Sequence, residues 1–332
     1  MSQRTLRIPL AFGALFVLSV AAFIAGLLIG QGDLGDPRLR DTLLDLRLSR
    51  AAVAYLAGAA HAVGGVLVQG FFRNPLASPS ILGTTAGASL GGQLAIMVFN
   101  LFLASTLAGY IVPEMFLSVG CMVGAAASLI LLMAIVGRRR DLIFLLLTGF
   151  ILSSLFLSVG SFLFALAQDS WELSRAVVAF SFGGVAGSGP RQVAFALPLV
   201  VSGVIVASLL SKRLDLLLSG EDEAQSLGVN VDDVRFMCIL WTSVLTAGAV
   251  SVGGNVAFVG LVVPHALRPI VGVEHRFLVP ASALAGGCFL VLCDIVSRLP
   301  QHEIPLGVVT GLVGAPVFLL LLVRARRRGT YG

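Results

Sequence analysis

Long stretches of this chain contain no charged residue, and most of them are long enough to cross a membrane as a helix. A transmembrane helix needs about 20 apolar residues to span about 30 Å of hydrocarbon. Uncharged stretches of about that length fall at 8–32, 51–72, 115–137, 142–168, 192–211, 277–293 and 304–323. Two longer ones cover 74–113 and 236–264. The pattern predicts an all-α, polytopic membrane protein rather than a β-barrel, which would show short segments of alternating polarity.

The composition supports this prediction over the whole chain. Only 12% of the 332 residues are charged and 57% are hydrophobic, whereas soluble domains carry about 25% charged residues. We expect one transmembrane domain, 1–332. Its N-terminal apolar run is expected to be the first span and not a cleaved signal peptide, because the run is too long and lacks a small-residue cleavage site. The four cysteines lie in apolar runs without a C-x-x-C motif, so packing is favoured over a metal or disulfide role.

The basic residues favour one side of the membrane. With Arg4 and Arg7 inside and the sides alternating span by span, fifteen of the 22 Lys and Arg residues, including the arginine run 138–140, lie inside. The 17 acids divide almost evenly between the two sides, so the bias follows the positive-inside rule. We therefore expect ten spans with both termini in the cytoplasm. The net charge of +5 then reflects topology and does not indicate nucleic acid binding.

Two segments are predicted to be short or broken helices. Between Arg235 and Arg268, both inside, the 32 residues would reach only about 48 Å as helix, whereas two crossings need about 60 Å. A break is expected at 253–256, near two consecutive glycines, and it should be enclosed by protein or line a water-filled path. The second break is expected at 74–82, where Asn74 and Pro75 begin a proline-rich turn.

Small residues recur at helical spacing after this turn. Gly83, Gly87 and Gly91 fall on one helix face, and Gly120 and Gly124 repeat the spacing further along. Such faces let two helix backbones approach closely. The contact is either packing within the chain, which is favoured, or contact with another chain.

No catalytic motif is visible, and the spans contain almost no acids. The chain lacks a phosphate-binding G-x-x-x-x-G-K-[ST] loop, an H-E-x-x-H pair and a G-x-S-x-G elbow. His61 stands alone in an apolar span, where hydrogen-bonded packing is favoured over a ligand role. Asp294 precedes Arg298 by four residues, the spacing of an ion pair within a helix. Without ionisable groups at depth, a carrier driven by protons or sodium is disfavoured.

One hydrophilic segment, 212–235, stands between two apolar runs. Because the chain has no nucleotide loop of its own, this segment favours a permease that borrows a separate ATPase. Six further sequence patterns lie in order along the chain: LRLSR at 46–50, FRNPLASPSILG at 72–83, GEDEAQSLG at 220–228, FVGLVVPHALR at 258–268, DIVSR at 294–298 and PLGVVTGLVGAPVF at 305–318. With them the chain resembles the iron-siderophore, haem and cobalamin permeases, the FecCD-like family of type II ABC importers. The matching structural motif includes Pro264, His265 and Arg268.

The resemblance implies an assembly in the bacterial inner membrane, surrounded by lipid. Two copies of the chain would form the pore, two cytoplasmic ATPases would bind ATP and Mg, and this chain would bind no cofactor itself. The cytoplasmic coupling loop would be 212–235, with two short helices joined at Gly228; the plain alternative is a solvated loop. The coupling residues would be Gly220, Glu221, Glu223, Ala224, Leu227 and Gly228.

On the outer face, the resemblance implies that a periplasmic binding protein docks through exposed arginines, namely Arg47, Arg50 and Arg298. The translocation path would be lined by Ser153, Ser154, Leu157, Ser158, Ser161, Arg175 and Phe180. Arg175 would either meet an anionic cargo or pair with Asp169 or Glu172. At position 180, relatives often have Trp, so the expected contact of Phe180 departs from the family pattern.

The function expected from these observations is import of an iron chelate, with a ferric siderophore favoured and haem or cobalamin next. The alternatives are an ATPase-independent carrier or channel, which would need buried coupling ions, and a membrane-embedded enzyme, which would need a polar catalytic cluster.

Overall fold

The computed structural model describes residues 3–30, 32, 35–36, 38–103, 113–137, 142–300 and 302–327. The expected inside arginines 138–140 and 328 lie outside the described residues. The described chain is all helical, with no strand among its elements. The long helices are α1 (Gln3–Leu28), α2 (Arg40–Phe71), α3 (Thr84–Val98), α4 (Pro113–Val136), α5 (Leu142–Leu166), α7 (Pro190–Leu217), α9 (Val231–Gly253), α10 (Val259–Val271), α11 (His275–Ser297) and α12 (Leu306–Arg327). The short elements are η1 (Pro79–Leu82), the π-helical η2 (Phe99–Leu103), η3 (Ala167–Asp169), α6 (Trp171–Ser181) and α8 (Glu221–Ser226).

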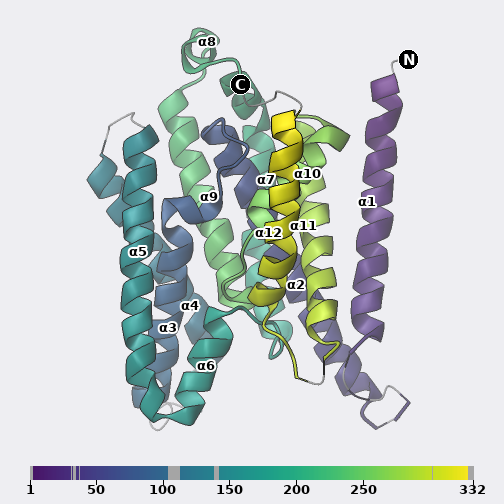
Figure 1. Cartoon of the computed structure of the whole chain (residues 1–332), viewed down its shortest axis with the longest axis vertical. Helices are drawn as coiled ribbons and strands as arrows, with labels where there is room; N and C mark the ends of the chain where they lie inside the picture. The colour runs from purple at the N-terminus through teal and green to yellow at the C-terminus, as the bar shows by residue number, and fades with distance from the viewer. Residues whose placement is uncertain are drawn as a thin grey trace.

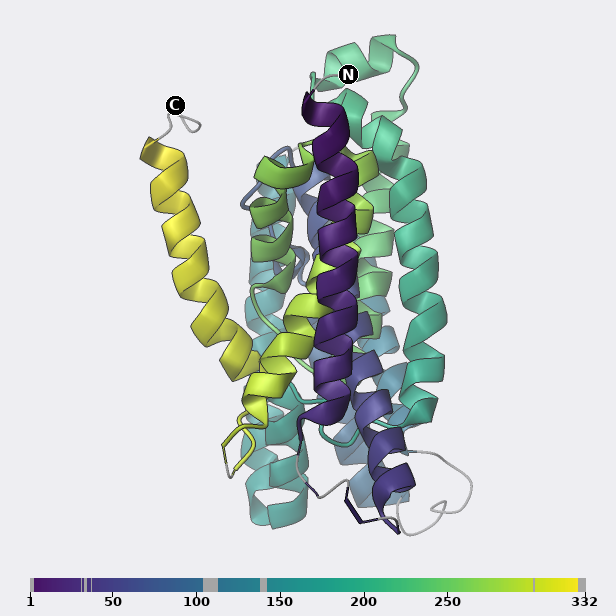
Figure 2. The ribbon, with the colours of Figure 1, turned by 90° about the vertical axis from the view of Figure 1, so that its right-hand side faces the viewer.

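The long helices form one bundle (Figure 1) from which the end of α12 leans away (Figure 2), and they confirm the predicted polytopic architecture with ten spans among the described residues. By length and composition, seven of them are long and apolar enough to cross a membrane. The start of α1, the end of α12 and all of α8 lie at one end of the bundle, at the top of Figures 1 and 2. We call this the α8 end and the opposite one the α6 end.

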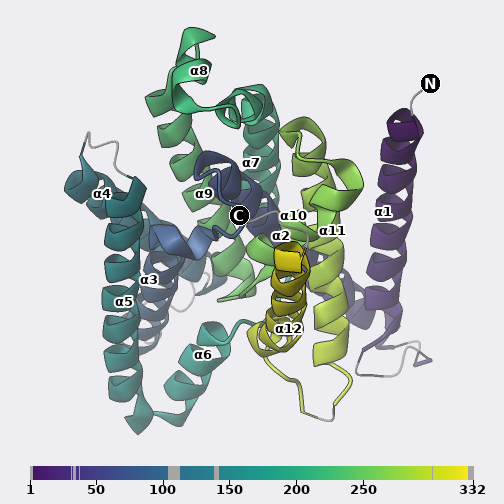
Figure 3. The ribbon, with the colours of Figure 1, turned by 45° about the horizontal axis from the view of Figure 1, so that its top comes forward.

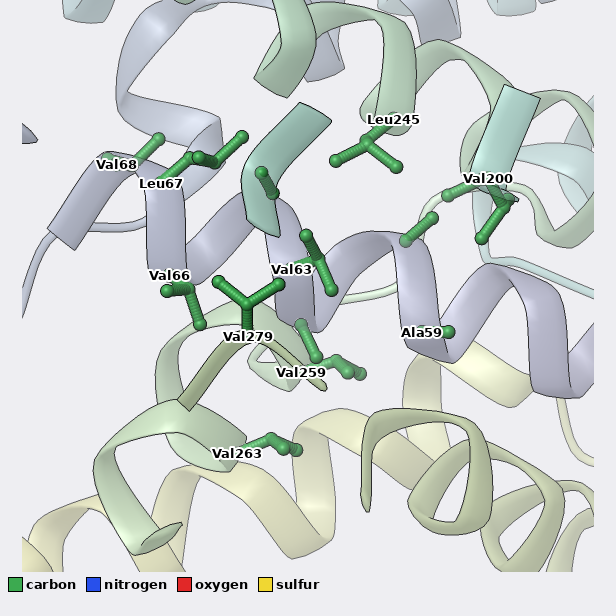
Figure 4. Packing of buried hydrophobic residues seen from close by; sticks show 14 of the residues in the cluster. Ala59, Val63, Val66, Leu67, Val68, Val200, Leu245, Val259, Val263 and Val279 are labelled. Atoms are coloured by element: carbon green, nitrogen blue, oxygen red, sulfur yellow. The ribbon is translucent and has the colours of Figure 1, made fainter. Parts of the chain in front are cut away.

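The centre of the bundle is α2, which is buried almost continuously over residues 51–72. Its small and branched side chains pack against α7, α9, α10 and α11. Figure 4 shows Val63 and Val66 of α2 among Leu245, Val259 and Val279 of the surrounding helices. A helix that is apolar on every side fits such a central position.

Glycines bring α2 and its neighbours into backbone contact. A Cβ on Gly58 would overlap the carbonyl oxygen of Gly286 in α11, and a Cβ on Gly65 would overlap that of Gly260 in α10. Larger side chains at these positions would force the helices apart.

The predicted glycine face of α3 packs within the chain, as favoured. Gly87 and Gly91 lie against Gly120 and Gly124 of α4, where an added Cβ would strike the facing backbone. Gly83 precedes α3 with a φ of +78°, a conformation that glycine adopts readily. This face therefore holds α3 against α4.

Both predicted helix breaks are present. Residues 74–78 form a turn in which the side chain of Asn74 accepts a hydrogen bond from Leu76 N at 2.9 Å, and η1 follows. α9 ends at Gly253, and α10 begins only at Val259. Between them, Gly254 and Phe258 have φ values of +66° and +67°. α10 has only 13 residues, about 20 Å of helix.

Candidate functional site

One face of α5 carries a row of hydroxyl groups. Each of these hydroxyls donates a hydrogen bond of 2.9 to 3.0 Å to a carbonyl oxygen four residues earlier in the same helix; the donors are Ser153, Ser154, Ser158 and Ser161. Ser154, Leu157, Ser158 and Ser161 are exposed and Ser153 is half-buried. Because the hydroxyl protons are already engaged, this face is mildly polar but offers few strong attachments. Its role in translocation stays a prediction.

Two cavities lie beside this face and a third lies behind them, and all three share Asn255. One of about 250 Å³ lies against α5 and α6, one of about 480 Å³ between α5 and the start of α3, and one of about 250 Å³ between α2 and α10. We call the polar surface around them the Asn255 wall; its members are Ser80, Thr85, Gln93, Ser153, Ser161 and Asn255. The helix break at 253–256 therefore borders three cavities. This agrees with the rule that irregular backbone inside a membrane is enclosed by protein or lines a water-filled space.

Hydrogen bonds connect the elements of the Asn255 wall. The side-chain amide of Gln93 in α3 donates to the hydroxyl of Ser181 in α6 at 2.8 Å. The single hydroxyl proton of Ser153 in α5 is shared between the carbonyl oxygen within its helix and that of Ser80, 3.2 Å away. Sequence reasoning missed Gln93 and Asn255, although an amide side chain in an apolar run is a signal for a functional site in a membrane.

Phe180, predicted to line the path, is buried in this structure. Its ring is only 8% exposed and lies in a small apolar cluster, against Gly92 and Cys121. Phe182, two residues later, is 52% exposed and lines a cavity of the Asn255 wall. α6 turns the side chain of Phe180 toward α3 and α4 in this structure, and its contact with the path stays a prediction.

Arg175 lies exposed on α6. Among the described side chains it has no ion-pair partner, so the expected pair with Glu172 is absent; the side chain of Asp169 lies outside the described set. Arg175 is therefore placed at the surface of the α6 end.

A buried ion cluster joins α2 to α11 near the α6 end. Asp294 is fully buried and lies 2.9 Å from Arg50 and 2.6 Å from Arg298, which confirms the predicted pair at four-residue spacing. Arg50 also meets Glu303 at 2.9 Å. We call these four residues the Asp294 cluster.

The expected exposure of the docking arginines is therefore corrected. Arg47 and Arg298 are only 6% and 5% exposed. Arg47 donates hydrogen bonds of 3.0 to 3.1 Å to four carbonyl oxygens at and after the end of α1, those of residues 27, 28, 30 and 32. The guanidinium group of Arg47 thus binds carbonyl oxygens of its own chain, and that of Arg298 binds the carboxylate of Asp294. Such partners are needed because a buried charge without them costs much free energy.

At the α8 end, the predicted coupling segment contains one short helix instead of two. α8 stands beyond the ends of α7 and α9 (Figure 3). After Gly228, with a φ of +84°, the chain enters α9 directly, capped by Asn230, whose side chain accepts from Asp233 N. Ala224 is buried, whereas Glu223 and Leu227 are exposed and available to a partner.

Glu221 is paired within its own chain. Its carboxylate lies 3.5 Å from Arg73 and 3.7 Å from Arg235. Arg235 in turn stacks over the ring of Phe71 at 5.4 Å. We call Arg73, Glu221 and Arg235 the Glu221 cluster; it connects α8 to the turn that follows α2.

A second contact near the α8 end was missed from the sequence. Asp215, near the end of α7, accepts hydrogen bonds from the backbone N of His275 at 2.8 Å and shares one of 2.6 Å with its Nδ1. These bonds attach the start of α11 to α7, next to α8.

The remaining predicted motif residues belong to α10. Pro264 is buried, the ring of His265 lies 6.5 Å from that of Phe318 in α12, and Arg268 lies in the last turn. Among the described residues, no three His, Cys, Asp or Glu side chains gather closely enough to hold a metal ion.

Known membrane transport proteins are similar to this chain in sequence and in fold. The pattern of the FecCD transport family matches residues 7–324. The cobalamin import permease BtuC of Halobacterium salinarum is 40% identical, covering 83% of this chain and 72% of its own. The Fe(3+) dicitrate permease FecD of Escherichia coli is 37% identical, covering 86% of each chain. A solved structure described as an inward-facing metal-chelate type ABC transporter superposes with a TM-score of 0.84 at 32% identity, covering 95% of this chain and 99% of that one.

Proposed function

The chain belongs to the FecCD transport family, as a permease subunit of an ABC importer that is not itself an ATPase, and we propose that its cargo is an iron chelate. A ferric siderophore is favoured, with haem and cobalamin next. The observation that carries this proposal is the hydroxyl face of α5 beside the Asn255 wall. A bulky chelate needs a broad, mildly polar surface that guides it without trapping it.

We propose that two copies of the chain enclose this path, with α5 facing it from each copy. The α8 end would be cytoplasmic and would receive one ATPase per copy through Glu223, Leu227 and the rest of α8. This orientation agrees with the positive-inside rule.

A periplasmic binding protein would dock at the α6 end. Since Arg47 and Arg298 are buried, the proposed contacts move to arginines that are exposed at this end: Arg38, Arg40, Arg175 and Arg191. Exposed arginines facing carboxylates of a partner speed and orient docking.

The test is ATP hydrolysis by the permease–ATPase complex in nanodiscs, with its binding protein loaded in turn with ferric siderophore, haem or cobalamin. We expect one loaded form to stimulate hydrolysis severalfold. Arg38→Glu with Arg191→Glu should remove that stimulation, whereas Arg38→Lys with Arg191→Lys should keep most of it.

A permease that forms no complex with any ATPase and still moves the chelate would overturn the proposal and favour the carrier alternative. Equal stimulation by all three loaded forms, or stimulation by cobalamin alone, would overturn the assignment of an iron chelate.

A further inference from the structure

Three segments that are far apart in the sequence meet at one backbone junction. They are the end of α6, the break between α9 and α10, and the start of α12. Four hydrogen bonds of 2.9 to 3.4 Å join them, from the N–H groups of Gly184, Asn255, Leu306 and Gly307 to the carbonyl oxygens of Gly253, Phe180, Gly183 and Phe182, respectively. We call this meeting point the Gly183 junction. It fixes the backbone of the break from two sides.

Glycines make the Gly183 junction possible. Gly183 and Gly254 have φ values of +76° and +66°, which glycine adopts far more readily than other residues. A Cβ on Gly307 would overlap the carbonyl oxygens of both Phe182 and Asn255. The three backbones therefore approach as closely as they can, and residues 182 and 255 are held in fixed positions relative to each other.

Two side chains of the Gly183 junction line the same cavity, the one of about 250 Å³ against α5 and α6. They are Phe182, whose ring is 52% exposed, and the half-buried Asn255. Among the described residues, the side-chain amide of Asn255 has no hydrogen-bond partner. An accessible ring and an amide with free donors and a free acceptor, both held by a rigid backbone, are the elements of a preorganised binding site.

The other walls of this cavity add aromatic rings and neutral polar groups. Phe156 and Phe164 of α5 line it, together with Gln93 and Ser161. Its described lining residues include no Lys, Arg, His, Asp or Glu. Aromatic rings pack favourably against other rings, and amides bond to oxygen and nitrogen atoms. A lipid tail would leave the amides without partners, and an anionic chelate without rings would find no cation here.

We propose that Phe182 and Asn255 form a contact that selects the cargo. The ring of Phe182 stacks on a flat ring of the chelate, and the amide of Asn255 bonds to the oxygen or nitrogen atoms beside that ring. The cargo is then a chelate that carries a flat ring system, such as a catecholate or a haem, and not a ring-free carboxylate chelate. The inference rests on the proposed function, because it narrows the class of iron chelate that is imported.

The dimensions of the site agree with a contact to one part of the cargo. At about 250 Å³ the cavity holds one ring with its substituents and not a whole chelate. Asn255 also lines the neighbouring cavity of about 480 Å³, between α5 and the start of α3, which gives room for the rest. Stacking and neutral hydrogen bonds are moderate attractions, so the cargo can leave again, as transport requires.

The test uses the full-length permease alone in nanodiscs, with a tryptophan at the site as reporter. Phe182→Trp keeps a ring at this position and adds fluorescence, which the iron of a bound chelate quenches. The probes are haem and a ferric tris-catecholate, which carry rings, and ferric dicitrate, which carries none. With the emission of the unaltered chain subtracted, we expect saturable quenching by at least one ring-bearing probe and none by ferric dicitrate at about tenfold higher concentration.

Phe16→Trp is the matched control, because Phe16 is 60% exposed on α1 and lines none of the three cavities that share Asn255. It should show only the quenching, without saturation, that is caused by probe dissolved in the membrane. Equal quenching of the two tryptophans, or equal affinity for ferric dicitrate, would overturn the proposal.

Equilibrium binding of the radiolabelled ring-bearing probe tests both side chains directly. Phe182→Leu and Asn255→Leu should each weaken binding about fivefold, and Asn255→Leu covers the case in which the variants of Phe182 fail to fold. Phe16→Leu should bind like the unaltered chain, and equal losses in all three variants would also overturn the proposal. Because the ATPase is left out, such a failure leaves the ATP-hydrolysis test of the importer standing.

Discussion

The charged clusters at the two ends of the bundle are built in opposite ways. In the Asp294 cluster the central carboxylate is fully buried and its two arginines approach to 2.6 and 2.9 Å. In the Glu221 cluster the carboxylate is 29% exposed and its arginines stand at 3.5 and 3.7 Å. Buried charges interact strongly and cannot lose a partner cheaply, whereas exposed pairs are screened by water. The Asp294 cluster therefore holds the α6 end rigidly as a clamp, whereas the Glu221 cluster at the α8 end can rearrange at a low cost in free energy.

This difference fits the roles proposed for the two ends, docking of a binding protein at the α6 end and coupling to an ATPase at the α8 end. The clamp fixes α2 to α11 near the surface where a binding protein would dock, so that the surface keeps its shape. The looser cluster joins α8 to the turn at 74–78, which continues into η1 and the start of α3. Glu221 therefore links α8 to this turn, and η1 and the start of α3 carry Ser80 and Thr85 of the Asn255 wall.

The largest loss of stability is expected when the buried carboxylate of Asp294 is removed. Asp294→Ala leaves two arginines near each other without their central counter-charge, and we expect a loss of about 3–5 kcal/mol in stability. The apparent melting temperature of the purified permease measures it. Glu303→Gln, at the exposed rim of the same cluster, should cost much less. If the two variants melt alike, the cluster is not a clamp.

Arg47 gives the next largest expected effect. Arg47→Met keeps most of the length of the side chain but strands the carbonyl oxygens at the end of α1, and we expect a loss of about 2 kcal/mol. Arg40→Met is the matched control, because Arg40 begins the same helix and is exposed. A melting temperature of Arg47→Met equal to that of the control would contradict the capping role.

At the loose end, Glu221→Gln should change stability by less than about 1 kcal/mol. Its effect is expected in function: ATP hydrolysis should continue while cargo moved per ATP falls, because α8 loses its link to Arg73. Proteoliposome uptake measured together with phosphate release gives this ratio. Glu223→Gln should leave the ratio nearer that of the unaltered chain, and equal ratios in the two variants would refute the link.

The smallest effect on stability is expected for Glu223→Arg, within about 0.5 kcal/mol. Because Glu223 is exposed on α8, reversal of its charge should reduce co-purification of the ATPase at least tenfold. Asp36→Arg is the control, because it changes the charge by the same amount in the loop between α1 and α2, at the α6 end. It should leave co-purification of the ATPase unchanged. Normal recovery of the ATPase with Glu223→Arg would remove α8 from the docking surface.

The helix breaks could be predicted from the sequence because they follow from length. Too few residues separate Arg235 from Arg268 for two full crossings, so the chain had to be irregular between them. What length cannot reveal is that the starts of α3 and α10 face the same cavity. That arrangement depends on the contact of Gly65 with Gly260, which joins segments almost 200 residues apart.

The burial of the arginines could not be predicted for a different reason. Spacing along α2 places Arg47 and Arg50 near one another, but it does not show that the end of α1 folds over one and Asp294 reaches the other. Similarly, Phe180 and Phe182 are both aromatic residues near the end of α6, and only the packing of Phe180 against Gly92 distinguishes a core residue from a surface one.

The shortness of α10 has a consequence for how the protein is made. At about 20 Å and interrupted by two prolines, α10 falls short of the hydrocarbon thickness that stabilises an independently inserted helix. During synthesis it must enter the membrane together with α9 or against helices that are already in place, with Gly65 receiving Gly260. We therefore expect a side chain at either glycine to lower the amount of assembled permease before it affects transport.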